Sequence, residues 1–305
     1  MHVLTRVSHV RSLVLHYAIA SFLAVPVLAQ DEELDPETRR QIELYQSIKW
    51  EIGPTTVDIG SNSQIQVPEG YQYTDRVGSQ IWNQLTQNPP DGTIGTLMPT
   101  DDDLSWFICF EFHDIGYVND EEKNNLDADA ILETVRQGTE ESNEYRRSQG
   151  WGTIETLGWI VSPKYDQASN SLVWALRLRD VESQIQSSNY SIRLLGRRGV
   201  MNVTLVDGVD TMMSSVASVN SLLNNFEFKS GHKHSEFEDG DKLAEYGLTG
   251  LIAGGAAVAA VKTGLFGKLI AMVGKFAKVI FIGIAVVLGA IWRALTGRPK
   301  TGQPS

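Results

Sequence analysis

Between residues 50 and 230, short runs of alternating apolar and polar side chains are separated by clusters of glycine, proline, asparagine and aspartate. In the run at 171–179, leucine and tryptophan side chains alternate with other residues over four repeats. A period of two residues predicts a β-strand with one buried face. Two such runs flank Gly196-Arg197-Arg198-Gly199, which predicts a hairpin. The pattern predicts strands at 55–59, 64–67, 93–99, 104–112, 153–161, 171–179, 190–195, 200–206 and 226–228.

Four segments show a helical period instead. Residues 30–50 form a charged lead-in whose apolar stripe begins after Asp35-Pro36, a typical helix start. The clearest helix spans about 127–149, with acidic side chains in its first turn and arginines in its last, an order that complements the helix dipole. Shorter helices are expected at 75–85 and 209–223. Strand pairs between helices predict an α+β fold for residues 51–241, with an antiparallel sheet covered by helices.

The C-terminal part of the chain has a different pattern. Residues 242–295 contain two long apolar blocks, 246–261 and 276–292, of sixteen and seventeen residues. A membrane-spanning helix needs about 20 apolar residues, with ~17 as the lower limit. We therefore expect 242–295 to be a membrane-anchoring helical region with one or two passes, followed by a basic tail at 296–305. A buried helical hairpin is the alternative, although its lysines fit a protein core poorly.

The polar side chains of this tract fit a membrane interface. Lysine stems can lie along apolar surface while the ammonium group reaches water, and a tryptophan beside an arginine is typical of the headgroup layer. The interface residues are therefore expected to be Lys262, Lys268, Lys275, Lys278, Trp292 and Arg293.

The N-terminus has the order of a secretory signal peptide. Residues 1–29 carry two arginines and no acid, then an apolar stretch, and end in Val27-Leu28-Ala29 before a sharply polar segment. We expect this segment to be cleaved, with an uncleaved N-terminal anchor as the alternative. Either way, the domain at 51–241 is expected to be exported.

Charge divides the chain at the same place as hydrophobicity. Residues 30–241 hold 36 acidic and 16 basic side chains, whereas residues 242–305 hold 1 acidic and 8 basic side chains. The acidic part argues against nucleic acid as a partner, because such binding depends on neutralising phosphates. The basic part suits anionic lipid headgroups, so the lipid bilayer is an expected partner.

Arg197 and Arg198 at the predicted hairpin tip are the leading candidates for a binding site. In so acidic a domain, two adjacent guanidinium groups could bind a phosphate or a partner's carboxylate. They could equally meet the domain's own acids or lipid headgroups. His232 and His234 are weaker candidates for Zn²⁺ or Cu²⁺, because Lys233 lies between them and no second motif completes a ligand set. No cofactor is expected.

A catalytic site has less support. The chain has no nucleophile elbow, phosphate-binding loop, zinc-protease helix or dinucleotide fingerprint. Cys109 is the single cysteine, so an intrachain disulfide is excluded, and its apolar surroundings predict a buried side chain. A hydrolase assembled from His113, Cys109 and nearby acids such as Glu111 stays open as an alternative.

Several short motifs give the chain a family resemblance. They are Val67-Pro68-Glu69-Gly70-Tyr71, Asn88-Pro89-Pro90, Gly116-Tyr117-Val118, Gly158-Trp159, Pro163-Lys164-Tyr165-Asp166, Leu195-Gly196-Arg197-Arg198-Gly199 and Tyr246-Gly247-Leu248. Over about 52–292 the chain resembles an uncharacterised bacterial family of predicted membrane-anchored proteins, a domain of unknown function. The resemblance implies an envelope protein with a C-terminal anchor and no assigned activity. The element order also resembles the α/β/α sandwich of PsbP and Mog1, which would place helices on both faces of the sheet.

These observations lead to one functional expectation and two alternatives. We expect a periplasmic domain, held at a bacterial inner membrane by its C-terminus, that binds an envelope protein as an accessory or assembly factor. The first alternative is the membrane-bound hydrolase described above. The second assigns the activity to the cationic tract at 243–295, which would disturb or sense membranes.

Overall fold

The computed structural model describes residues 35–90, 92–101 and 103–253. The chain divides into two compact units, Met1–Gly255 and Ala256–Ser305, and every described residue belongs to the first. The predicted signal segment and most of the predicted membrane tract therefore lie outside the described residues.

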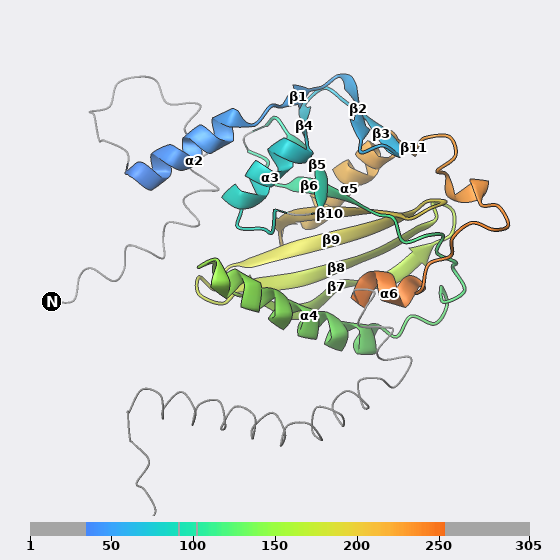
Figure 1. The fold of residues 1–305 in the computed structure, drawn as a ribbon. Coiled ribbons are helices and arrows are strands. Elements are labelled where there is room, and N and C mark those ends of the chain that lie inside the picture. Colours follow the sequence, from blue (N-terminus) through green and yellow to red (C-terminus); the bar gives the residue numbers. More distant parts are fainter. Residues whose placement is uncertain (1–34, 91, 102, 254–305) are drawn as a thin grey trace, which may run out of the picture. The chain divides into compact units, whose positions relative to one another are not determined.

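An eight-stranded sheet forms the centre of the first unit (Figure 1), and all its neighbouring strands are antiparallel. Its centre is built from two hairpin-like pairs, β5 with β6 and β9 with β10, which meet along β6 and β10. In spatial order the strands are β1 (Glu51–Ile52), β4 (Tyr71–Asp75), β5 (Thr93–Pro99), β6 (Phe107–His113), β10 (Val200–Gly208), β9 (Gln186–Leu195), β8 (Ser171–Asp180) and β7 (Ile154–Asp166).

A second, three-stranded sheet has the order β11-β3-β2 and is also antiparallel. It consists of β2 (Thr55–Ile59), β3 (Ser63–Val67) and β11 (Phe226–Phe228). Its buried side chains join those of α5 (Met212–Leu223) and one face of the large sheet in the main core.

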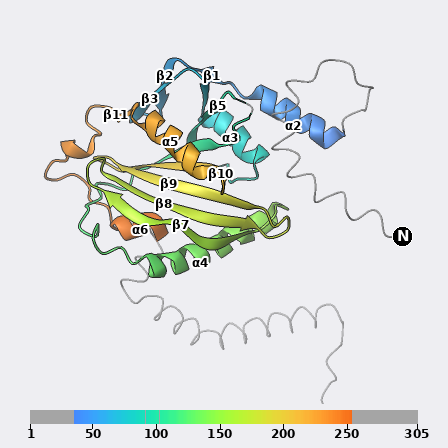
Figure 2. The ribbon, with the colours of Figure 1, turned by 180° about the vertical axis from the view of Figure 1, so that it is seen from behind.

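Helices lie on both faces of the large sheet (Figures 1 and 2). On the face turned away from α5, α3 (Arg76–Leu85) packs on β4 and β5, and α4 (Ala128–Ser148) packs on β7. The short α6 (Leu248–Ala253) lies against α4, and α2 (Pro36–Ser47) lies against α3. The expected α+β fold with an antiparallel sheet and covering helices is confirmed.

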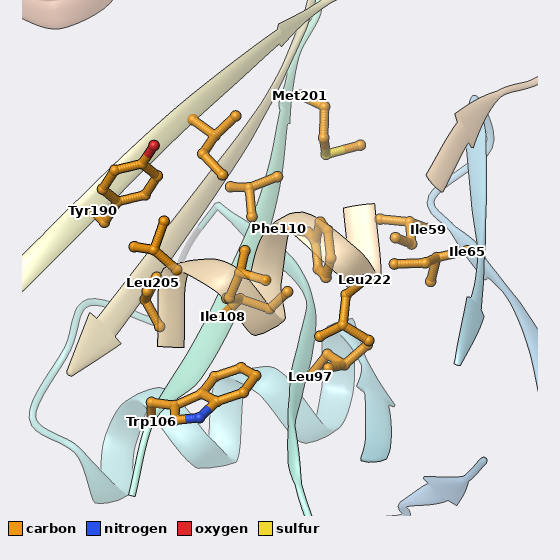
Figure 3. Packing of buried hydrophobic residues seen from close by; sticks show 14 of the residues in the cluster. Ile59, Ile65, Leu97, Trp106, Ile108, Phe110, Tyr190, Met201, Leu205 and Leu222 are labelled. Atoms are coloured by element: carbon orange, nitrogen blue, oxygen red, sulfur yellow. The ribbon is translucent and has the colours of Figure 1, made fainter. Parts of the chain in front are cut away.

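The main core fills the space between the large sheet, α5 and the small sheet (Figure 3). Alternate residues of β6 and β10 supply its centre, because successive side chains of a strand point to opposite faces. Ile108, Phe110, Met201 and Leu205 are each fully buried, and Leu222 of α5 closes over them. Each large apolar side chain buried in this way contributes about 1.5–3 kcal/mol.

A second cluster lies on the opposite face, under α4 and α6. Trp174 of β8 and Ile131 of α4 are buried in it, together with Leu248 and Ile252 of α6. Residues 242–253, which the sequence assigns to the membrane anchor, thus fold back onto the globular unit. The sequence pattern does not predict this docking, because a short helix buried on one side and a membrane helix are both rich in apolar residues.

Helix starts follow the sequence closely. Asp35, Asp75 and Asp127 cap α2, α3 and α4, and the side chain of each accepts hydrogen bonds from backbone N–H groups of the first turn. An N-terminal cap satisfies donors that the helix leaves free, which is why aspartate is favoured there.

Several strand predictions need correction, and the two-residue β1 at Glu51–Ile52 was also not expected. β4 at Tyr71–Asp75 was not expected, because it lies between a turn and the cap of α3. β7 continues past Pro163 to Asp166, since it is the edge strand and its pairing to β8 shifts register three times. Proline is tolerated at edges and bulges because no ladder hydrogen bond is lost. β9 begins at Gln186 rather than at 190.

None of the helices in the part of the chain that the structure describes is both long enough and apolar enough to cross a membrane. The interface residues predicted in the tract, Lys262, Lys268, Lys275, Lys278, Trp292 and Arg293, lie outside the described residues.

Candidate functional site

A polar strip runs across the middle of the large sheet, on the face that carries α3 and α4. On this face α3 packs near one edge of the sheet, on β4 and β5, and α4 packs at the other edge, on β7. The strip occupies the strands between them, β6, β10 and β9 (Figure 1). A sheet face covered by helices is normally apolar. The strip consists of Cys109, Glu111, His113, Asn202, Thr204, Ser191 and Arg193.

Strand register aligns three of these side chains in one row, with Thr93 of β5 beside them. Thr93 of β5 is paired with Glu111, Glu111 with Asn202 of β10, and Asn202 with Arg193 of β9. Residues directly opposite each other on neighbouring strands share one face of a sheet. The row therefore places a hydroxyl, a carboxylate, an amide and a guanidinium side by side.

Glu111 and His113 form the acidic half of the strip. The Oε2 atom of Glu111 lies 3.6 Å from Nε2 of His113, and both side chains are partly exposed. The Nδ2 atom of Asn202 lies 3.1 Å from the same Nε2, and the Thr93 hydroxyl donates to Glu111 over 3.5 Å. Contact with His113 is the main cause that holds the pKa of Glu111 below its usual range. Glu111 is therefore an anion near neutral pH.

Arg193 forms the basic half of the strip. Its guanidinium carbon lies 4.6 Å from the centre of the buried Trp174 ring, which is a cation–π contact. The side chain is partly buried, and desolvation lowers its pKa to about 10, while Glu111 opposes that shift. Arg193 forms no ion pair with any carboxylate among the described residues. It remains protonated at neutral pH.

Cys109 lies on the same face of β6 as Glu111 and His113. Burial raises the pKa of its thiol to about 12, so the thiolate needed for nucleophilic attack is scarcely populated. Four residues of strand separate Cys109 from His113, a distance of about 13 Å between their backbones. The histidine and the acid of the alternative hydrolase site thus come together, but the cysteine is not placed to be activated by them.

Arg197 and Arg198 occupy the turn between β9 and β10, where the hairpin was predicted. The Arg197 guanidinium donates to both carboxylate oxygens of Asp241, from Nε over 2.7 Å and from Nη2 over 3.0 Å, and it also meets Glu238 at 3.0 Å. Its side chain is only 12% exposed. The sequence left open whether these arginines meet an external anion or the domain's own acids, and Arg197 contacts the domain's own acids. Arg198 is exposed.

His232 and His234 lie in the segment that follows β11. The His234 ring stacks on Tyr117 with 4.5 Å between centroids, and burial is the main cause that lowers its pKa. Nδ1 of His232 and Nε2 of His234 are buried and have no hydrogen-bond partner among the described atoms. Within the described ranges, no three histidine, cysteine or acidic side chains are grouped so as to hold a metal ion.

Comparisons with known proteins agree with the resemblance seen in the sequence. Residues 51–287 match the model of the family described as "Protein of unknown function (DUF2167)". The chain belongs to this family. A comparison with curated proteins found no match.

Among solved structures, the chain is similar to cyanobacterial PsbP (CyanoP) from Synechocystis sp. PCC 6803, with 12% identity and a TM-score of 0.35 over 59% of this chain and 92% of that one. It is also similar to the Ran-binding protein Mog1p of Saccharomyces cerevisiae, with 11% identity and a TM-score of 0.29 over 62% of this chain and 100% of that one. Both likenesses concern the fold alone.

The family match assigns no site, so the polar strip rests on geometry. Reasoning from the sequence did not single out Arg193 or Asn202. The available signal was the alternation of Asn189, Ser191 and Arg193 along β9, which places polar side chains where a helix-covered strand would carry apolar ones.

Proposed function

We propose that this member of the family is a binding module that works as an accessory or assembly factor in the bacterial envelope. In this proposal the described domain lies in the periplasm, the C-terminal tract holds it at the inner membrane, and the polar strip contacts a protein partner. The observation that carries the binding role is the strip itself: charged side chains in the middle of a sheet, on a face whose flanks are covered by helices.

Fixed polar groups favour recognition over catalysis here. The carboxylate of Glu111 is occupied by His113 and Thr93, and the thiol of Cys109 is held protonated by burial. A nucleophile and its base must lie within hydrogen-bond reach of one another. Among the described residues no such pair involves Cys109, whereas a partner can use the strip without any proton transfer.

Site-specific photocrosslinking in cells tests the binding role. A photoreactive amino acid would replace Thr204 or Asn189, which are half-buried in or beside the strip, in the full-length chain. Matched controls would replace Glu144 on the outer side of α4 and Glu227 on β11, which are exposed. We expect one discrete crosslinked protein from the strip positions and none from the controls. Equal patterns at all four positions would contradict the proposal.

The location is tested separately. Alkaline-phosphatase fusions after residues 240, 270 and 305 would report which segments are exported, and carbonate extraction would report membrane attachment. We expect an active fusion at 240 and retention in the membrane pellet. An inactive fusion at 240, or release of the full chain by carbonate, would refute this part.

The contact between His113 and Glu111 favours a hydrolase as the second candidate, because a histidine oriented by an acid is a common general base. Purified full-length chain would be assayed against ester, peptide and phosphoester substrates, alongside His113→Gln. Turnover abolished by His113→Gln with unchanged folding would favour the hydrolase. Absence of turnover, together with a strip-specific crosslink, would favour the binding role.

A further inference from the structure

The guanidinium of Arg193 has unused binding capacity. An arginine side chain carries five N–H donors. The hydrogen bond that Arg193 forms with the described residues runs from Nη1 to the backbone oxygen of Ile192 and is 3.5 Å long. Arg197 shows the contrast within the same chain, because Asp241 and Glu238 engage its Nε and Nη2 groups.

The position of Arg193 makes its free N–H donors energetically unfavourable. Its guanidinium rests on Trp174, which is 2% exposed, so one face of the group is shielded from water. A buried or half-buried charge is stabilised by a partner that accepts its hydrogen bonds. Contact with the ring also restricts the motion of the guanidinium, which lowers the cost of ordering its N–H groups around a ligand.

The nearest anion of the strip does not fill this role. Glu111 lies two strands away from Arg193, with Asn202 between them, and strands are about 4.8 Å apart. Its Oε2 faces His113 and its Oε1 faces Thr93. Glu111 therefore acts on Arg193 through space only, and it sets a negative field beside the free guanidinium edge.

We propose that Arg193, stacked on Trp174, is a recognition site for a carboxylate group presented by the partner. The inference rests on the proposed binding function and specifies its chemistry. A carboxylate matches the flat edge of a guanidinium with two parallel hydrogen bonds. The neighbouring Glu111 repels a doubly charged phosphate more strongly than a singly charged carboxylate, which selects the latter.

Titration of the full-length chain in detergent tests the site directly. The Nε–Hε signal of Arg193 would be followed by NMR in arginine-labelled protein and assigned from its loss in Arg193→Lys. The probes are N-acetylglycine, with a main-chain carboxylate, N-acetylaspartate α-amide, with a side-chain carboxylate, and N-acetylglycinamide, with neither. Inorganic phosphate is the fourth probe. We expect a saturable shift with one or both carboxylates and none with the amide. The stronger of the two identifies the source as a chain terminus or an acidic side chain.

Three variants separate the role of the Arg193 guanidinium from a general effect of charge. Arg193→Lys retains the charge but lacks the paired N–H donors of a guanidinium, and should weaken carboxylate binding about tenfold, read from the indole N–H signal of Trp174 in tryptophan-labelled protein. Arg177→Lys is the matched control, because Arg177 is exposed on the opposite face of β8 and bonds to Gln186. It should leave binding unchanged. Glu111→Gln leaves Arg193 and Trp174 in place and should tighten carboxylate binding several-fold by removing the repulsion.

No response to either carboxylate, an equal response to the amide, or a stronger response to inorganic phosphate than to both carboxylates would overturn the inference. Weaker binding in Glu111→Gln would overturn it as well, even if the Arg193 variant failed to fold. Failure here is distinguishable from failure of the proposed function. A strip-specific crosslink without carboxylate binding would support the proposed partner-binding function and refute the carboxylate site at Arg193. Carboxylate binding without a crosslink would support the site and refute the proposed function.

Discussion

Substitution of Leu248 by alanine tests whether α6 belongs to the globular unit. Leu248 is fully buried in the cluster beneath α4, where it packs with Ile131 and Val118. Removing three carbon atoms costs about 2.4 kcal/mol in transfer free energy at ~0.8 kcal/mol for each. The cavity left behind adds to this, so buried leucine-to-alanine changes cost about 2–5 kcal/mol. We therefore expect Leu248→Ala to lower the free energy that holds α6 on the domain by about 3 kcal/mol.

Hydrogen exchange measured by mass spectrometry reads this loss at defined amides. The N–H groups of Gly250 and Leu251 donate to the Gly247 carbonyl, and that of Thr249 donates to Glu122 over 2.8 Å. A loss of about 3 kcal/mol corresponds to roughly hundredfold faster exchange when the helix opens locally. If docking of α6 contributes less than that, protection of these amides disappears altogether. The first turns of α4 should lose protection in parallel.

Leu243→Ala serves as the matched control. Its side chain is 59% exposed, although its backbone pairs with Tyr117. Exposed substitutions usually change stability by less than about 0.5 kcal/mol, so exchange in α6 should stay within a few-fold of the original. Unchanged exchange in Leu248→Ala, or equal acceleration in both variants, would refute the packing of α6 on the domain.

Three further predictions concern titratable groups. Cys109, which is half-buried, should react with a thiol reagent at pH 8 much more slowly in the native protein than in the unfolded chain, since burial raises the pKa of its thiol to about 12; equal rates would contradict this. Contact with Arg197 lowers the pKa of Asp241, so its stabilising effect is present at neutral pH and is lost as pH falls through that lowered pKa. Asp241→Asn should therefore expose residues 229–247 to limited proteolysis at pH 7, and the difference from the original chain should shrink as the pH falls through the lowered pKa of Asp241. Burial lowers the pKa of His234, so protonation favours the unfolded chain and stability should fall from about pH 7.5 to 5.5. His234→Phe keeps a ring on Tyr117 and should reduce that fall in the urea midpoint; an equal fall would assign the effect to other groups.

Much of the fold was predictable because local signals were strong. The caps at Asp75 and Asp127 mark the starts of α3 and α4, and the alternation along β8 marks a strand with a buried face. Where the signals were weak, the predictions failed. β4 is five residues long and lies between a turn and a helix cap, so it carries little pattern of its own. A proline such as Pro163 interrupts a strand that is paired on both sides, but β7 is an edge strand and can continue through it.

The candidate site was less predictable, because it depends on pairing between distant segments. His113 and Glu111 are two residues apart on one strand, so their contact could be expected from the sequence. Arg193 and Asn202 join them only through the register of β9, β10 and β6. Composition draws attention instead to Arg197 and Arg198, whose adjacency is obvious in the sequence, although Arg197 is paired within the domain.

The Arg197 contacts nevertheless bear on the polar strip. The β9–β10 hairpin closes with a hydrogen bond from Gly196 N–H to the Gly199 carbonyl, and Arg197 in that turn is fixed to Asp241. A side chain at Gly199 would collide with the carbonyl oxygen of His113, so the turn also fits closely against the end of β6. A shift of one residue in either pairing would move Arg193 to the core face of the sheet. The turn therefore holds the register that places carboxylate, amide and guanidinium in one row, and Arg197, prominent in the sequence, supports the site from its end rather than forming it.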